Sequence, residues 1–532
     1  MIMKKHKTMR PHITFITLTI IMILSACKSD RLSEATVTLK DGVIQGTVEN
    51  GIAVFRGIPF AAPPVDELRW KAPQPVEPWK GVRMADKYAP APIQSTVLWM
   101  GDIDMSEDCL YLNIWTPAKS KKEKLPVMVW IHGGGFSNGA SFSPVYSGEN
   151  IAANGVILVS VAYRLGALGF LALPELSAES EHGVSGNYGL LDQIAGLKWV
   201  QDNIEAFGGD PAKVTIFGES AGAISVSMLC ASPLARGLFS GAISESGGSF
   251  GPVGDSRGMG EHSVSLKGAE EMGVKFEERM GVNTLDELRA LPFEKWLDDP
   301  LSQMGGFWPA VDGYVIAGDQ YKLYQQGKYN DVNVIIGTNS DEGSIFVQPM
   351  DPPQYADLIK LRFGPLADRA LELYPGNDRM EVYYSLSDIF RETVFAWPTY
   401  AWARLQSETG KSKVFVYYFD QFRAEPLYPD GPVPKGAAHA SELAYVFGHL
   451  KQNPAAEVTD EEQALSDVMI KYWTNFAKSG DPNAEGLPAW PLFRDGEVTV
   501  MYLKGDMPHP VPVPNLDKLQ FMDEYFAWLR EQ

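Results

Sequence analysis

Residues 218–222 place a serine in the backbone turn that a catalytic nucleophile requires. They read Gly-Glu-Ser-Ala-Gly, follow an apolar run at residues 214–217 and precede a segment with helical potential at residues 223–229. A strand, a G-x-S-x-G turn and a helix form a nucleophile elbow, whose small residues allow a turn sharp enough to lift the hydroxyl above the sheet. The pattern therefore predicts that Ser220 is a nucleophile.

The general base for this serine should be a histidine later in the chain. A serine hydroxyl is a poor nucleophile until an imidazole takes its proton and an acid orients that imidazole. The chain order serine, acid, histidine leaves His439, His449 and His509. His449 could lie on the surface, and His509 lies between two prolines. His439 lies in a loop of small residues after a predicted strand, so the spacing favours it.

Two neighbouring carboxylates are candidates for the acid. Asp341 and Glu342 follow the predicted strand at residues 332–337, and open α/β sheets build their sites at the carboxyl ends of strands. Either side chain could instead cap the following helix. Residue type and spacing do not separate the two.

A glycine-rich segment could supply the oxyanion hole. The sequence His-Gly-Gly-Gly-Phe at residues 132–136 directly follows a predicted strand, and a developing oxyanion needs backbone N–H groups aimed at it. Gly134 and Gly135 could present two such groups, and Ala221 the third. A flexible hinge and a phosphate-binding loop are the alternatives, but no G-K-[ST] sequence follows to support the latter.

The elements that must position these residues alternate in type. Apolar runs of strand length are separated by stretches with helical periodicity, which favours an α/β fold with a large, mostly parallel sheet covered by helices on both faces. Without internal repeats or a clean linker, we predict one domain over residues 35–532. Residues 57–64 are predicted to be a loop, because proline cannot enter a central strand. The predicted strands are 35–39, 43–48, 52–55, 111–115, 127–132, 156–162, 214–217, 332–337 and 413–419, and the predicted helices are 189–204, 223–229, 265–280, 285–296 and 460–478.

The composition indicates a globular protein that does not bind nucleic acid. Of the 532 residues, 45% are hydrophobic and 21% are charged, and the formal net charge is -20. No basic tract occurs beyond the N-terminus, which argues against a nucleic-acid partner. The acidic balance favours solubility but does not select a substrate.

Residues 1–26 are predicted to be a lipoprotein-type signal peptide. Four basic residues precede an apolar run at residues 13–24, which is too short to span a bilayer comfortably, as in export signals. The run ends in Leu-Ser-Ala-Cys, which resembles a bacterial lipobox and makes Cys27 the lipidated first residue, followed by a tether to residue 34. We expect a lipid anchor in the cell envelope, at the outer membrane. An ordinary secretory signal, giving a periplasmic or secreted protein, is the alternative.

Motifs spread over nearly the whole mature chain resemble those of the type-B carboxylesterase family. The elbow, with Phe-Gly-Gly at residues 207–209 before it, is similar to one signature, and Glu-Asp-Cys-Leu-Tyr-Leu-Asn-Ile at residues 107–114 is similar to a second. Further matches lie at residues 57–60, 341–344, 439 with 442, 473–477 and 480–483. The resemblance implies an α/β-hydrolase fold and hydrolysis of small to medium carboxylic esters, with no metal or organic cofactor.

The resemblance also implies roles for individual residues. It favours Glu342 over Asp341 as the acid and supports His439 as the base. It implies that the hydroxyl of Ser246 holds Glu342. It further implies two structural ion pairs, Arg69 with Glu107 and Arg164 with Asp192.

The chain departs from the family pattern at one cysteine. Family members often pair the cysteine at the position of Cys109 with another that precedes Pro-Gln, but Pro92 stands in that place here. We therefore expect Cys109 and Cys230 to be buried free thiols, although they could pair with each other.

Trp99, Phe136 and Gly305 are candidates for the substrate pocket. Trp99 lies ten residues before Cys109, as does the choline-binding tryptophan of cholinesterases, so it is expected either to bind a cation through its ring or to be a hydrophobic residue of a lid. Gly305 stands where cholinesterases carry bulky aromatics, which implies a roomier acyl pocket. Glu219 could disfavour anionic substrates, or could simply accept a hydrogen bond in the elbow.

Two other functional classes use a similar chain. Amidases, lactonases and thioesterases share the same acyl-transfer machinery, and their leaving-group preference depends on pocket shape. Non-catalytic adhesion proteins on this scaffold lose residues of the triad, whereas Ser220, Glu342 and His439 all stand at matching positions here. An ester hydrolase is therefore the favoured interpretation.

The lipid anchor can be tested on the mature protein. We expect that mass spectrometry of the N-terminal peptide will show cleavage before Cys27 and a mass increase from attached acyl chains, because the lipobox pattern directs both events. An N-terminal peptide with an unmodified Cys27 would contradict the anchor.

Overall fold

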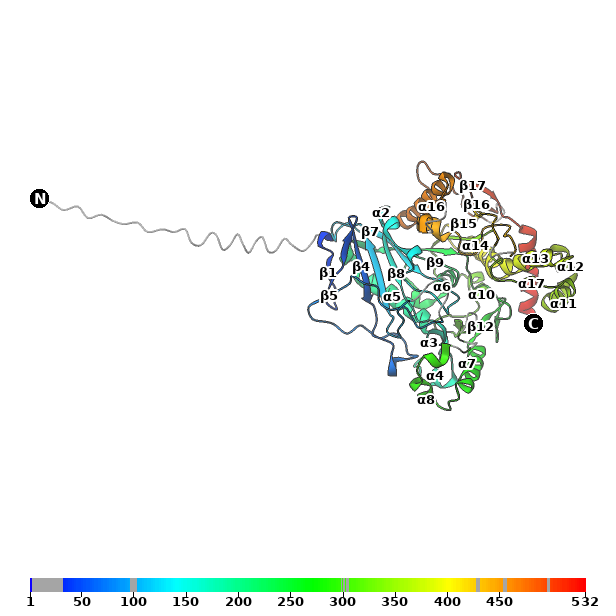
Figure 1. The fold of residues 1–532 in the computed structure, drawn as a ribbon, viewed down its shortest axis with the longest axis horizontal. Coiled ribbons are helices and arrows are strands. Elements are labelled where there is room, and N and C mark those ends of the chain that lie inside the picture. The colour runs from blue at the N-terminus through cyan, green and yellow to red at the C-terminus, as the bar shows by residue number, and fades with distance from the viewer. Residues whose placement is uncertain are drawn as a thin grey trace.

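The computed structural model describes Met1 and residues 32–95, 103–297, 299, 302, 306–426, 431–452, 457–494 and 498–532 (Figure 1). The predicted signal peptide from residue 2 onward, together with Cys27, lies outside the described residues, so the anchor stays a prediction. The side chain of Leu32 is already buried in the core. Among the helices that the structure describes, none is both long and apolar enough to cross a membrane.

An eleven-stranded sheet forms the centre of the molecule. Its strand order is β17-β16-β15-β14-β10-β9-β7-β8-β6-β4-β3. The strands from β8 to β16 in this order pair in parallel, whereas the strands at both ends pair antiparallel. The sequence-based prediction of a large, mostly parallel sheet is confirmed. The strands are β3 (Thr47–Glu49), β4 (Ile52–Pro59), β6 (Tyr111–Thr116), β7 (Leu125–Ile131), β8 (Ile157–Val161), β9 (Gly209–Glu219), β10 (Gly241–Glu245), β14 (Asn333–Asn339), β15 (Val414–Phe419), β16 (Thr499–Leu503) and β17 (His509–Pro512).

Two three-stranded sheets flank the central one. The first has the order β1-β2-β5 and the second β11-β12-β13. Their strands are β1 (Thr36–Thr38), β2 (Val43–Gln45), β5 (Val82–Met84), β11 (Val253–Gly254), β12 (Ser263–Ser265) and β13 (Ala310–Val311).

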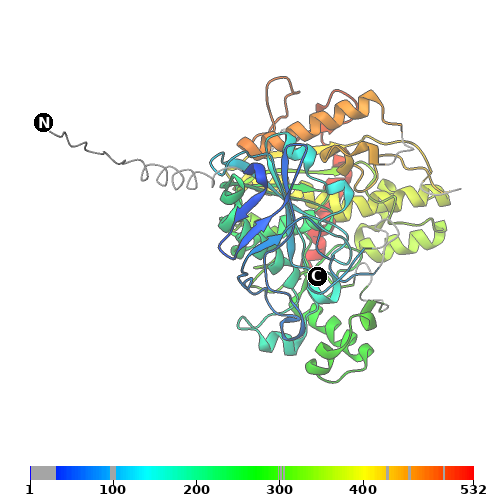
Figure 2. The ribbon, with the colours of Figure 1, turned by 60° about the vertical axis from the view of Figure 1, so that its left-hand side comes forward.

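Helices cover both faces of the central sheet. Successive side chains of its strands point to opposite faces, so one strand contributes to the cores on both sides. Met128 and Trp130 of β7 pack in one core with Trp473 of α16. Val129, from the same strand, packs in the other core with Ile194 of α5. Figure 2 shows α16, in orange, lying apart from α17, in red. The helices are α2 (Glu149–Ala153), α3 (Gly166–Phe170), α4 (Pro174–Glu179), α5 (Tyr188–Asn203), α6 (Ala221–Ala231), α7 (Leu266–Met280), α8 (Leu285–Ala290), α9 (Glu294–Leu297), α10 (Gln320–Gln325), α11 (Pro352–Phe363), α12 (Ala367–Leu373), α13 (Arg379–Arg391), α14 (Trp397–Thr409), α15 (Leu443–Val446), α16 (Asp460–Ser479) and α17 (Leu516–Glu531).

The predicted loop at residues 57–64 is wrong for its first three residues, because β4 continues to Pro59. A β-bulge between Phe55 and Ile58 shifts the register against β6. Gly57 adopts a φ of 70° at this bulge. A bulge and a terminal position are the places where a strand accepts glycine and proline.

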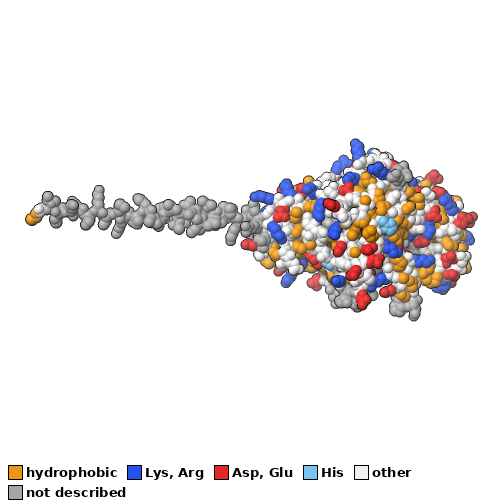
Figure 3. Space-filling model, turned by 90° about the horizontal axis from the view of Figure 1, so that it is seen from above, with side chains coloured by type: hydrophobic (Ala, Val, Ile, Leu, Met, Phe, Trp, Pro, Cys, Tyr) orange, Lys and Arg blue, Asp and Glu red, His pale blue; other side chains and the backbone are white. Residues whose placement is uncertain are grey.

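Charges of both signs are interspersed on the face seen in Figure 3, with hydrophobic side chains between them. That face therefore shows no large basic patch.

Candidate active site

The nucleophile elbow is a strained turn between β9 and α6. Ser220 has φ 56° and ψ -123°, a backbone conformation that L-residues rarely adopt and that clusters at functional sites. Its N–H donates to the carbonyl of Glu245 on β10 at 2.9 Å. A Cβ at Gly222 would lie 2.0 Å from the carbonyl oxygen of Ile131, and one at Gly218 would lie 2.6 Å from the same atom. Both glycines are therefore required by the close approach of β7.

The His439 imidazole lies between two carboxylates. Its Nδ1 is 2.6 Å from Oε2 of Glu342, and its Nε2 is 3.1 Å from Oε1 of Glu219, the residue before Ser220. The ring of Phe395 stacks on the imidazole with centroids 4.6 Å apart. These contacts fix the ring so that Nε2 faces the elbow.

Glu342 is fully buried and makes three polar contacts. Besides the contact with His439, its Oε1 accepts hydrogen bonds from the Ser246 hydroxyl and from the N–H of Asn339, both at 2.6 Å. Ser246 directly follows β10 and has a φ of 59°, which turns its hydroxyl toward the end of β14. The carboxylate is thereby fixed in orientation from the side opposite the imidazole.

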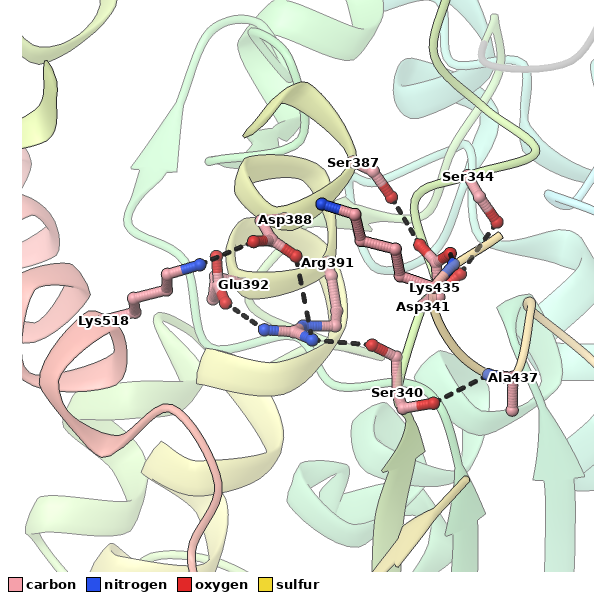
Figure 4. A network of polar contacts seen from close by, with 10 residues as sticks. All are labelled: Ser340, Asp341, Ser344, Ser387, Asp388, Arg391, Glu392, Lys435, Ala437 and Lys518. Atoms are coloured by element: carbon pink, nitrogen blue, oxygen red, sulfur yellow. Dashed lines mark hydrogen bonds and ion pairs between the residues drawn. The ribbon is translucent and has the colours of Figure 1, made fainter. Parts of the chain in front are cut away.

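Asp341 faces away from the imidazole. Its carboxylate accepts hydrogen bonds from the Ser387 hydroxyl at 2.7 Å and from the N–H of Lys435 at 2.9 Å, as Figure 4 shows. Its N–H donates to the carbonyl of Ala437 at 2.9 Å. Asp341 therefore joins its own loop to α13 and to the loop that carries His439.

The same network continues to the last helix (Figure 4). The Ser340 hydroxyl accepts a hydrogen bond from the N–H of Ala437. The backbone carbonyl of Ser340 accepts another from the Arg391 guanidinium at 2.7 Å. Arg391 lies 3.9 Å from Asp388, which pairs with Lys518 of α17. The loops that carry Glu342 and His439 are thus tied both to each other and to two helices.

Buried carboxyl groups surround the imidazole. Burial raises the pKa of Glu219 to about 7, with a smaller opposing effect of His439, and raises the pKa of Glu442 to about 8. Burial also raises the pKa of Glu245, which accepts a hydrogen bond from an indole N–H. Burial alone would lower the pKa of His439, but the charges of Glu219 and Glu342 outweigh it and raise that pKa to about 9. The site thus favours an imidazolium between carboxylates.

The glycine-rich loop lies directly against the elbow. A Cβ on Gly133 would be 3.0 Å from the Cβ of Ser220. Gly134 and Gly135 have φ angles of 103° and 61°, which are open to glycine without strain. No hydrogen bond within the described chain uses the N–H of Gly134 or of Gly135. Both donors remain available beside Ser220, as does the first N–H of α6, that of Ala221.

The structure describes one of the three predicted pocket residues, Phe136. Phe136 is buried, with its ring against Phe170 and Trp308. Trp99 and Gly305 lie outside the described residues. Sequence reasoning missed Phe395, which belongs to a π-helical turn (Glu392–Ala396) that no pattern indicated.

Other predicted features outside the site are present. Arg69 contacts Glu107 in a partly buried ion pair, and Arg164 lies 2.8 Å from Asp192 in a buried one. The prediction of free thiols is also confirmed, because Cys109 and Cys230 are both free and buried.

Comparisons with known proteins identify the family of the chain. The family model described as Carboxylesterase family matches residues 33–511. The chain is 36% identical over 489 residues to para-nitrobenzyl esterase of Bacillus subtilis (strain 168), covering 87% of this chain and 94% of that protein. It is 36% identical over 472 residues to fumonisin B1 esterase of Sphingopyxis macrogoltabida, covering 86% and 85%.

A solved structure supports the same relationship. The structure titled PNB esterase superposes with a TM-score of 0.78 at 35% identity, covering 92% of this chain and 99% of that chain. The fold, the matched length and the identity agree, and the chain belongs to the carboxylesterase family, as a carboxylic ester hydrolase of the type-B kind.

Proposed function

We propose that the protein hydrolyses small to medium carboxylic esters through an acyl-enzyme on Ser220. The observation that carries this proposal is the position of His439. Its Nδ1 is held by Glu342 at 2.6 Å, and its Nε2 faces the residue before Ser220 at 3.1 Å. An imidazole in this position can take a proton from the serine and return it to a leaving group.

The first half of the reaction forms the acyl-enzyme. The Ser220 oxygen attacks the ester carbonyl while Nε2 of His439 takes its proton, and the carbonyl oxygen becomes an oxyanion. The N–H groups of Gly134, Gly135 and Ala221 stabilise that charge. As the tetrahedral intermediate collapses, the carbon–oxygen bond to the alcohol breaks, and His439 protonates the leaving alcohol.

The second half releases the acid. A water molecule loses its proton to His439 and attacks the acyl carbonyl, and the bond to Ser220 then breaks. In both halves Glu342 holds the proton-bearing Nδ1 and stabilises the imidazolium. Two bonds to Glu342, from Ser246 and from the backbone, keep that carboxylate oriented.

The nucleophile is tested by Ser220→Ala. We expect turnover of 4-nitrophenyl butyrate to fall by roughly 10^4-fold or more, because the remaining groups of such a triad act as a unit and cannot replace the nucleophile. Circular dichroism should show an unchanged fold. Turnover close to that of the parent protein would contradict the assignment.

The acid is tested by a matched pair of carboxyl-to-amide substitutions. We expect Glu342→Gln to lower kcat by roughly 10^3- to 10^4-fold, because an amide cannot stabilise the imidazolium or keep its tautomer. Asp341→Asn should leave kcat within about 10-fold, since Asp341 contacts Ser387 and Lys435 rather than the imidazole. Steady-state kinetics gives kcat for both variants and shows which carboxylate is the acid. The opposite order would make Asp341 the acid.

The role of Glu219 is tested through the pH profile of kcat/KM. His439 must be neutral to act as a base, so activity should rise as the pH passes through its pKa. Glu219→Gln removes a negative charge that raises this pKa, so the rise should move to lower pH. Glu149→Gln, beside His449, is the control and should not move the profile. An unchanged or upward-shifted rise in Glu219→Gln would refute the coupling.

A further inference from the structure

A shallow, open cleft lies beside the nucleophile elbow, and the empty space of about 490 Å³ at this place includes the solvent at its mouth. Two of its wall segments adjoin the candidate active site. Gly248 follows Gly247, where a Cβ would lie 2.8 Å from the carbonyl oxygen of Ser220. Val394 precedes Phe395, the residue that stacks on His439. The cleft is therefore within reach of one part of an ester whose carbonyl is held at Ser220.

Arg257 brings a positive charge to the wall of this cleft. Its half-buried guanidinium lies over the ring of Trp308, with the guanidinium carbon 3.4 Å from the ring centroid. Trp308 in turn contacts Phe136 of the glycine-rich loop, with centroids 4.9 Å apart. The arginine is thus fixed by a ring that also packs on the predicted oxyanion loop.

Within the described chain, the guanidinium of Arg257 has no carboxylate or hydrogen-bond partner. The nearby acid, Glu261, is already used: it pairs with Arg362 at 2.8 Å and accepts a hydrogen bond from the N–H of Met259 at 2.6 Å. His262, also in the wall, has an Nδ1 without a partner in the described chain. Burial lowers the pKa of His262, so its imidazole adds no positive charge at neutral pH.

No ion pair within the described chain balances the charge of Arg257, which the ring of Trp308 and the more remote charge of Glu261 stabilise only in part. Burial lowers the pKa of Arg257 to about 10, which leaves it cationic at neutral pH, and a partly desolvated cation without a partner is unfavourable. A guanidinium that stacks on a ring keeps the N–H groups of its edge free for bidentate binding of a carboxylate. A carboxylate is thus the ligand that this wall fits best.

We propose that the cleft binds a carboxylate carried by the substrate, and that Arg257 selects esters bearing such a group. The inference rests on the proposed ester hydrolysis at Ser220. The carboxylate could belong to the acyl part, as in a monoester of a dicarboxylic acid, or to the alcohol part.

The test compares charged esters with neutral esters of similar size. For the acyl part, mono-4-nitrophenyl glutarate is compared with 4-nitrophenyl pentanoate, and for the alcohol part 3-(butanoyloxy)benzoate is compared with phenyl butanoate. We expect a higher kcat/KM for the charged ester in one pair. Arg257→Gln should lower that value by roughly 10- to 100-fold and leave the neutral ester within about 3-fold.

Two further variants separate recognition from folding. Arg257→Lys keeps the charge but loses the planar fork, so it should retain part of the preference. Arg83→Gln removes an exposed arginine that lies over the ring of Trp79 and should have no effect. Equal losses on charged and neutral esters in Arg257→Gln, or no preference for either charged ester in the parent protein, would overturn the proposal.

Binding without turnover distinguishes failure of this proposal from failure of the proposed reaction. In Ser220→Ala, calorimetry with the preferred charged ester should give a dissociation constant that rises roughly 10- to 100-fold when Arg257→Gln is added. If the parent protein hydrolyses none of the esters, the proposed reaction fails. The binding experiment then uses mono-4-nitrophenyl glutarate and 3-(butanoyloxy)benzoate as ligands. An unchanged dissociation constant would refute the cleft proposal itself.

Discussion

The contact between His439 and Glu342 is the interaction on which the candidate site depends. It joins two loops that are far apart in the sequence, and it places an imidazole in an interior where charges are costly unless they are paired. The neighbouring Asp341 and Ser340 do not touch the imidazole, but they join the two loops through Lys435 and Ala437, and Asp341 also joins its loop to α13 through Ser387. Because the loops are held by backbone and hydroxyl contacts, the imidazole and the carboxylate can meet without depending on their mutual attraction alone.

Close backbone approach is the second constraint. Gly218 and Gly222 allow the elbow to lie against the end of β7, and Gly133 allows the glycine-rich loop to lie against the elbow. The strained backbone of Ser220 is kept in place by the hydrogen bond to β10 and by the start of α6. The strain is offset by the packing of a sheet whose two faces are both buried.

Much of the fold and the identity of the candidate nucleophile could be predicted from the sequence, because apolar runs and the elbow are local patterns. Asp341 and Glu342 could not be separated on residue type, since neighbouring side chains in a loop take directions that only tertiary contacts decide. Helices α11 to α14 were missed, although α13 is as amphipathic as α16, which was predicted. Arg257 was missed because its partner ring, Trp308, is distant in the sequence and carries no motif.

The contacts that connect the loop carrying Glu342 to α17 affect the order in which the site is completed during synthesis of the chain. Asp388, which lies 3.9 Å from Arg391 on the same helix, can pair with Lys518 only once α17 has left the ribosome. A nascent chain that already contains Ser220, Glu342 and His439 therefore still lacks one support of the loop that carries Glu342. We expect this support to be completed only when the C-terminal helix has docked, so that partly synthesised chains should be poorer hydrolases than the full chain.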